Sequence, residues 1–140
     1  MYQLHPRLQQ DTVYLGQLTL CDVLLMNDAR YPWVILVPRR EDLTETYQLN
    51  EKDQQQLMTE SVFVAKQLSS LVGADKMNIA ALGNVVSQLH IHHVARYQTD
   101  EAWPAPVWGK GNAVSYNPDE AQAVAEQLKV IFTELLRDGC

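Results

Sequence analysis

Apolar runs alternate with polar, turn-forming clusters along the first half of the chain, a pattern typical of short β-strands. The segments predicted as strands are residues 12–15, 21–26 and 33–37. Gly16 is expected to end the first strand, and Pro38 the third, because proline cannot donate to a β-ladder. Short polar links between the runs predict an antiparallel meander.

Two longer segments have the spacing of amphipathic helices. The first is expected over residues 50–72, with Asn50 as its N-cap and Gly73 as its C-terminal stop. Its apolar stripe consists of Leu57, Val64, Leu68, Leu71 and Val72. The second begins at Asn117-Pro118-Asp119-Glu120 and extends to about Arg137. Its stripe consists of Ala121, Val124, Ala125, Leu128, Ile131, Phe132 and Leu135.

A further strand is predicted over residues 76–82, followed by a tight turn at Gly83-Asn84. The next strand is expected to contain three of the four histidines. There the polar residues Gln88, His90 and His92 alternate with apolar ones at the period of a β-strand. We therefore expect these three side chains on one face of the sheet and His93 on the other.

The order of elements predicts an α+β fold, in which two main helices pack on an antiparallel sheet of about five strands. The 140 residues are expected to form a single domain, residues 1–140. The net charge of −6 argues against binding to a nucleic acid backbone, although local dipoles could still hold a nucleotide. We expect a cytoplasmic protein, because the chain has no membrane-length apolar run, no signal segment at its start and no disulfide framework.

Three interpretations of the histidine cluster remain open. His90 and His92 could lie on a half-solvated strand face without a function. They could share a metal ion, although a structural zinc would need two more ligands, and both cysteines lie far away in the sequence. They could also act as neutral imidazoles, which near neutral pH are good nucleophiles and proton carriers. We favour the third interpretation and expect neither a bound metal nor a cofactor.

The segment from Gly83 to Arg96 resembles the signature of the histidine triad (HIT) family, His-φ-His-φ-His-φ-φ with φ apolar. His90 and His92 match the second and third histidines, and Gln88 occupies the position of the first. We expect all three at the catalytic site, where Gln88 could orient its neighbours but cannot gain a proton at neutral pH. The resemblance extends over about residues 13–96. It implies a homodimer that binds a small-molecule nucleotide and cleaves it at the α-phosphorus.

The same resemblance implies roles for individual residues. His90 would be the nucleophile that forms a nucleotidyl–histidine intermediate, and His92 would bond to a phosphate oxygen. Asn27 matches a position that contacts the ribose hydroxyls, although asparagine there is equally typical of a turn. Asn78 and Asn84 match positions whose amides contact phosphate and ribose. The backbone amides at Gly83 could cradle an anion.

Three positions depart from the family pattern: Gln88 replaces a histidine, Val85 replaces a common Ser or Thr, and Trp33 stands where many members have a histidine. Candidate substrates are dinucleoside polyphosphates and nucleoside phosphoramidates. The alternative is a nucleotide-binding regulator with little turnover. Trp103 and Trp108 lie in a later loop, where they could cover the core, join a dimer interface or stack on a base.

Overall fold

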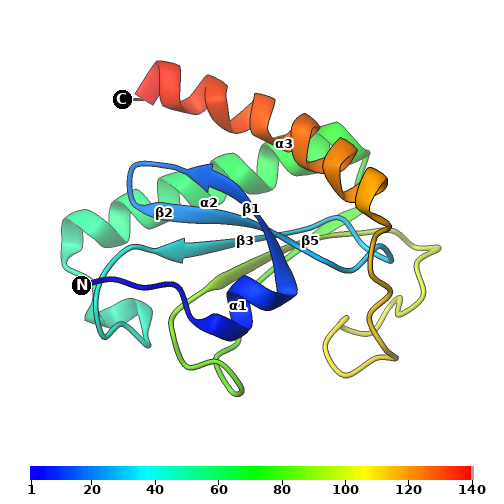
Figure 1. Cartoon of the computed structure of the whole chain (residues 1–140), viewed down its shortest axis with the longest axis horizontal. Helices are drawn as coiled ribbons and strands as arrows, with labels where there is room; N and C mark the ends of the chain where they lie inside the picture. Colours follow the sequence, from blue (N-terminus) through cyan, green and yellow to red (C-terminus); the bar gives the residue numbers. More distant parts are fainter. Residues whose placement is uncertain (140) are drawn as a thin grey trace.

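The computed structural model describes residues 1–139, and for residues 134–139 the backbone alone. Within this range the chain forms one antiparallel sheet of five strands in the order β1-β2-β3-β5-β4 (Figure 1). The strands are β1 (Thr12–Gln17), β2 (Cys21–Met26), β3 (Trp33–Pro38), β4 (Lys76–Ala81) and β5 (Ile91–Arg96). The predicted α+β class is therefore confirmed.

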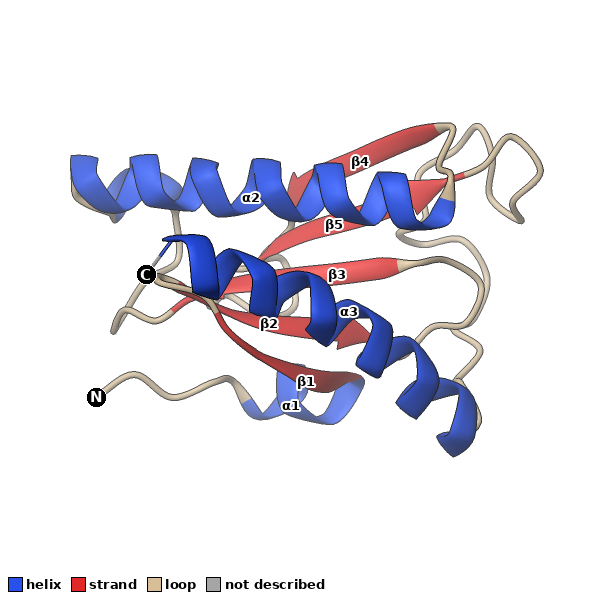
Figure 2. Cartoon of the chain, turned by 90° about the horizontal axis from the view of Figure 1, so that it is seen from above, coloured by secondary structure: helices blue, strands red, loops and turns tan. Residues whose placement is uncertain are grey.

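The two long helices, α2 (Glu51–Val72) and α3 (Pro118–Gly139), lie across the same face of this sheet (Figure 2). A short helix, α1 (Pro6–Asp11), lies on the other side, and a 3-10 turn, η1 (Thr46–Gln48), precedes α2. No helix within residues 1–139 is long and apolar enough to cross a bilayer.

The helix ends follow the predicted capping chemistry. Asn50 accepts a hydrogen bond from the Asp53 amide at 2.8 Å, and Gly73 ends α2 with a left-handed backbone, at φ 64°. Asn117 likewise accepts from the Glu120 amide at 2.8 Å. Ala125, Leu128 and Phe132 are the buried positions of the α3 stripe, whereas the Leu135 side chain lies outside the described residues. Both predicted helices are confirmed at their starts.

Alternate residues of β3 supply two separate cores. Val34 and Leu36 pack with the helices on one face of the sheet. Ile35 and Val37 pack on the other face against a layer formed by α1 and the segment after β5. Because all six residues of β3 are buried, this strand forms the rigid centre of the sheet.

Two predictions about strand ends are wrong. β1 continues past Gly16 to Gln17, with an irregular register between Tyr14 and Gly16. β5 begins only at Ile91, and residues 82–90 form a long loop instead of a tight turn (Figure 1). The alternation before Ile91 has the period of a strand, but the Leu89 amide donates to the Leu43 carbonyl outside the sheet. Gln88 and His90 therefore both precede β5, and His92 alone of the three residues predicted to share a strand face lies in the strand.

Candidate functional site

His90 and His92 lie next to each other on the sheet face opposite α2 and α3. Their ring centroids are 4.9 Å apart and the rings are inclined at 72°. His93 points to the opposite face, where its Nε2 lies 2.7 Å from the Ser61 hydroxyl of α2. The predicted pairing of His90 with His92, and the opposite direction of His93, are therefore confirmed.

A backbone carbonyl determines which nitrogen of His90 is protonated. His90 Nδ1 lies 2.7 Å from the carbonyl oxygen of Gln88, which can only accept a hydrogen bond. Nδ1 must therefore carry the proton, and Nε2 of the neutral ring has a free lone pair. Burial lowers the pKa of His90, which favours this neutral form. The ring thus has the protonation state that a nucleophile needs.

His92 has the complementary tautomer. The indole N–H of Trp33 donates to His92 Nδ1 at 2.9 Å, so the proton of the neutral ring is on Nε2. Burial, and after it the neighbouring His90 and His93, lowers the pKa of His92 to about 3. His90 therefore presents an acceptor nitrogen and His92 a donor nitrogen, with both rings uncharged at neutral pH.

Two cavities adjoin His90, although both histidine side chains are only 5% exposed. The larger, of about 270 Å³, contacts both rings and has apolar walls from Leu8, Ile35 and Trp108. The smaller, of about 240 Å³, is lined mainly by polar groups, which include those of Thr44, Glu45, Asn84 and Ser87. Leu82, Asn84 and His90 border both cavities. Each is somewhat smaller than the roughly 300 Å³ at the low end of ligand pockets, and together they exceed it.

A scan against family models matches residues 7–99 to the HIT domain. The chain belongs to the HIT family.

Solved structures agree with this membership over nearly the whole chain. A histidine triad protein from Marinobacter aquaeolei VT8 is 51% identical, with a TM-score of 0.94, and the match covers 96% of this chain and 98% of that one. A histidine triad protein from Bradyrhizobium japonicum is 46% identical, with a TM-score of 0.91, covering 94% and 98%. One from Sinorhizobium meliloti 1021 is 43% identical, with a TM-score of 0.88, covering 95% and 96%. A search of curated proteins gives no match.

The side chain of Gln88, two residues before His90, bonds to the amino-terminal segment and forms no hydrogen bond to the histidine rings in the described structure. Its amide oxygen accepts from the His5 backbone N–H at 2.8 Å, and its amide nitrogen donates to the Gln3 carbonyl at 2.9 Å. Gln88 therefore holds the amino-terminal arm, which we define as residues 1–5. Its backbone carbonyl, by contrast, contacts His90 directly.

The four residues expected to bind substrate fall into two groups. Gly83 and Asn84 line the cavities at His90, and a Cβ at Gly83 would lie 3.3 Å from the Val86 carbonyl oxygen. Asn27 and Asn78 line neither cavity. Asn27 accepts from the Tyr116 amide at 2.9 Å, and the amide oxygen of Asn78 accepts from Arg96 at 2.8 Å. Both therefore hold neighbouring segments in this structure.

Tryptophan side chains close the site on one side. The Trp108 ring lies 5.2 Å from the His92 ring and 6.0 Å from the Trp33 ring, both edge-on. Trp108 therefore covers His92 of the site as well as the core. Its indole N–H is buried and has no hydrogen-bond partner among the described residues. Trp103 lies apart, under the guanidinium of Arg96.

Sequence reasoning missed two charged residues at the site. Arg7 and Asp11 line the larger cavity from α1, and Arg7 Nε donates to Asp11 at 2.9 Å. Their spacing of four residues is the only sequence signal, and it is common on solvated helix faces. Among the side chains that the structure describes, no three His, Cys, Asp or Glu residues are grouped as a metal site requires.

Proposed function

We propose that this protein binds a nucleotide in the cavities beside His90 and cleaves it at the α-phosphorus, as a hydrolase or a nucleotidyl transferase. The observation that carries the proposal is the pair of complementary tautomers. One buried neutral ring offers a lone pair and its neighbour, in ring contact with it, offers an N–H. Such a pair suits attack on phosphorus beside an oxygen that gains negative charge.

In the first step, the His90 Nε2 lone pair forms a bond to phosphorus, and the bond from phosphorus to the leaving group breaks. The leaving group departs with that electron pair and takes up a proton from water. The positive charge that develops on His90 is offset by the Gln88 carbonyl at Nδ1. His92 Nε2–H donates to a phosphate oxygen. Water or another acceptor then forms a bond to phosphorus and releases its proton to solvent. The bond from phosphorus to His90 Nε2 breaks, and its electron pair returns to the ring.

The two cavities suggest how the substrate lies. The larger one, with Leu8, Ile35 and Trp108 in its walls, suits the nucleoside. The smaller one, which contains Gly83 and Ser87, suits the leaving group. Asn84 borders both and is our candidate for the phosphate contact between them. Asn27 and Asn78 would act by holding the segments around the site.

Turnover of a substrate panel tests this proposal. Wild-type protein, His90→Asn and His92→Asn would each be given nucleoside phosphoramidates and dinucleoside polyphosphates. Asparagine preserves a polar group of similar reach but is no nucleophile, so His90→Asn is expected to lower kcat by at least 10³-fold. His92→Asn is expected to lower it by about 10²-fold, as for the loss of one oxyanion donor. Equal rates for wild type and His90→Asn would refute the proposal.

A regulator that binds nucleotide with little turnover is the second candidate. The observation that favours it is the 5% exposure of both rings, which leaves little room for an attacking water. Calorimetric binding of AMP, together with kcat values for the whole panel at the uncatalysed rate, would select this candidate over the enzyme.

We also propose that the protein is a homodimer. β4 is an edge strand, and Ile79 on it is half exposed, as is typical of an edge that pairs with another chain. Light scattering after size-exclusion chromatography tests this, with Ile79→Lys expected to shift the mass towards the monomer. A monomeric wild type would rule the dimer out.

A further inference from the structure

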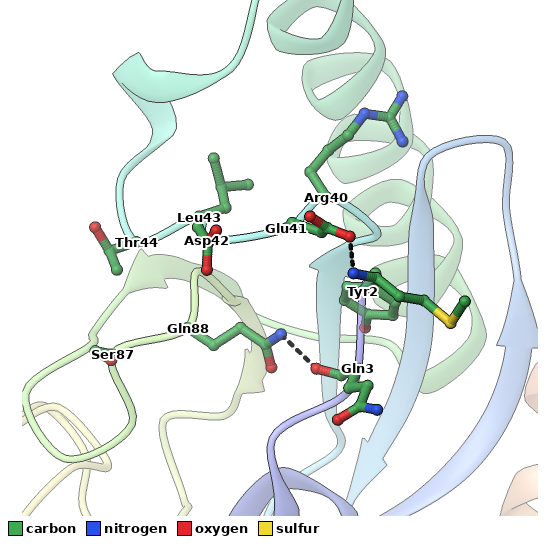
Figure 3. Close-up of a pocket in the computed structure, with 10 residues that line it drawn as sticks. Tyr2, Gln3, Arg40, Glu41, Asp42, Leu43, Thr44, Ser87 and Gln88 are labelled. Carbon is green, nitrogen blue, oxygen red and sulfur yellow. Dashed lines mark hydrogen bonds and ion pairs between the residues drawn. The ribbon is translucent and has the colours of Figure 1, made fainter.

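Both ends of the Gln88 side-chain amide bind the amino-terminal arm. Its nitrogen donates to the Gln3 carbonyl (Figure 3), and its oxygen accepts from the His5 N–H. A glutamine is well suited to this contact, because it combines an acceptor with donors on one planar group. A glutamate side chain has no donor for the Gln3 carbonyl, and a leucine side chain has neither a donor nor an acceptor.

The main chain of the same residue binds the proposed nucleophile. The Gln88 carbonyl lies 2.7 Å from His90 Nδ1, and this contact leaves the lone pair on Nε2. The arm and the nucleophile are thus joined through a single residue. That residue lies in the loop 82–90, outside the ladder of β4 and β5, so the sheet itself does not fix its position.

Further contacts dock the arm on both sides of Gln88. The Tyr2 hydroxyl donates to the buried Asp22 carboxylate at 2.9 Å. His5 caps α1, because its Nδ1 accepts from the Arg7 amide at 3.0 Å. Since α1 supplies Arg7 and Asp11 to the larger cavity, docking of the arm also places one wall of the site.

We propose that Gln88 is a positioning residue that couples docking of the amino-terminal arm to the orientation of His90, so that the arm is a working part of the site. Gln88 does not stand in for a triad histidine at the substrate, because both ends of its amide are already bound. The kinetic part of this inference rests on the proposed function, whereas the structural part does not.

Two substitutions at His5 separate the backbone contact from the ring. His5 has φ −55°, a value that proline also adopts, so His5→Pro removes the N–H that donates to Gln88 with little change in the local backbone. His5→Ala keeps that N–H and removes the imidazole. Both variants lose the side-chain cap of α1, so they differ mainly in the contact to Gln88.

Three substitutions test the Gln88 side of the contact. Gln88→Leu removes both hydrogen bonds, and Gln88→His places the usual triad residue there. Gln3→Ala is the control, because Gln3 joins the contact through its backbone carbonyl. Nitrogen-15 NMR of the histidine rings at pH 8 reports the tautomer of His90 without any substrate. Amide exchange of residues 2–5 reports docking of the arm, and kcat and KM are measured in parallel.

We expect His5→Pro and Gln88→Leu to speed amide exchange in the arm and to convert His90 into a mixture of tautomers. kcat should fall about tenfold, the scale of one lost hydrogen bond. His5→Ala and Gln3→Ala should keep the wild-type tautomer. Gln88→His should behave like Gln88→Leu.

An unchanged His90 tautomer in both His5→Pro and Gln88→Leu would overturn the inference, as would Gln88→His turnover at or above the wild-type rate. If wild type turns over no substrate, the proposed function fails, and the tautomer and exchange data still decide the coupling.

Discussion

The indole N–H of Trp33 donates to Nδ1 of His92, at a distance of 2.9 Å, between two rings that are both almost fully buried. Trp33 lies at the start of β3 and faces the neighbouring strand β5. This bond fixes the tautomer of His92 and hence the direction in which its remaining N–H can donate. Trp33 thereby supplies a nitrogen donor to the site.

The first prediction concerns this donor. Trp33→Phe preserves an aromatic ring but leaves His92 Nδ1 buried without a partner, which should cost about 1–3 kcal/mol of unfolding free energy. kcat should fall about tenfold, because the His92 ring can then exchange tautomers. Trp33→His, which restores a ring N–H, is the matched control and should recover part of the loss. Nitrogen-15 shifts of His92 and chemical denaturation measure both effects. A Trp33→Phe protein with wild-type stability and an unchanged His92 tautomer would contradict this interpretation.

The second prediction concerns acid stability. Burial lowers the pKa of His92 to about 3 and that of His93 to about 4, from 6.5 in the unfolded chain. Between these values the unfolded state binds more protons than the folded state, so stability falls as the pH falls. The loss should begin near pH 6.5 and reach about 1.4 kcal/mol per pH unit for each ring. Urea unfolding from pH 8 to pH 4 measures it, and His92→Asn should show a shallower slope. An equal slope in the two proteins would show that His92 does not contribute.

The third prediction concerns the buried ion pair after β5. Asp100 accepts two hydrogen bonds from Arg96, at 2.8 and 3.0 Å, and this pairing lowers the pKa of Asp100 to about 2. Asp100→Asn leaves the Arg96 charge buried without its partner and should cost about 3–5 kcal/mol. The exposed ion pair of Arg7 and Asp11 in α1 serves as the comparison. Arg7→Gln should lower the free energy of unfolding by less than about 1 kcal/mol. Similar losses in the two variants would contradict the argument from burial.

The fourth prediction concerns Trp108. Its indole N–H has no partner among the described residues, so Trp108→Phe removes a donor without breaking an internal hydrogen bond. The melting temperature should remain within about 2 °C of wild type, because removing a donor that has no partner leaves no acceptor unsatisfied. KM should rise several-fold, because Trp108 lines the larger cavity and the smaller phenylalanine ring leaves part of that wall unfilled. Trp108→Ala, which also opens the wall beside His92, should lower both stability and kcat. A lower melting temperature in Trp108→Phe with an unchanged KM would show that the indole N–H is structural.

Periodicity predicted the parts of the fold that depend on neighbours in the sequence. The helix from Asn50 to Gly73 has both a good cap and a left-handed stop, so its ends were readable. The start of β5 at Ile91 could not be predicted in this way. Alternation of polar and apolar residues is equally compatible with a loop whose polar groups have partners elsewhere in the chain. In that region Gln88 bonds to His5 of the arm, which lies 83 positions earlier in the sequence.

In the candidate site, too, contacts between sequence neighbours were predictable and contacts between distant residues were not. The alternation predicted that His90 and His92 lie together, and their rings do meet, although His90 lies one residue before β5. Trp33 is 59 positions from His92, and nothing in the local sequence indicates that their rings meet. Arg7 and Asp11 reach the cavity through the docking of a short helix, which depends on tertiary contacts alone. The motif therefore predicted the proposed reacting ring but not the groups that orient it.

The most direct measurement is to trap the proposed intermediate. Wild-type protein mixed with a nucleoside phosphoramidate would be quenched within milliseconds at alkaline pH, and its peptides mapped by mass spectrometry. The account predicts a nucleotidyl group bonded to His90, more abundant in His92→Asn if release is slowed, and absent in His90→Asn. Turnover by the wild type with no adduct on His90, or with an adduct on a different side chain, would contradict it.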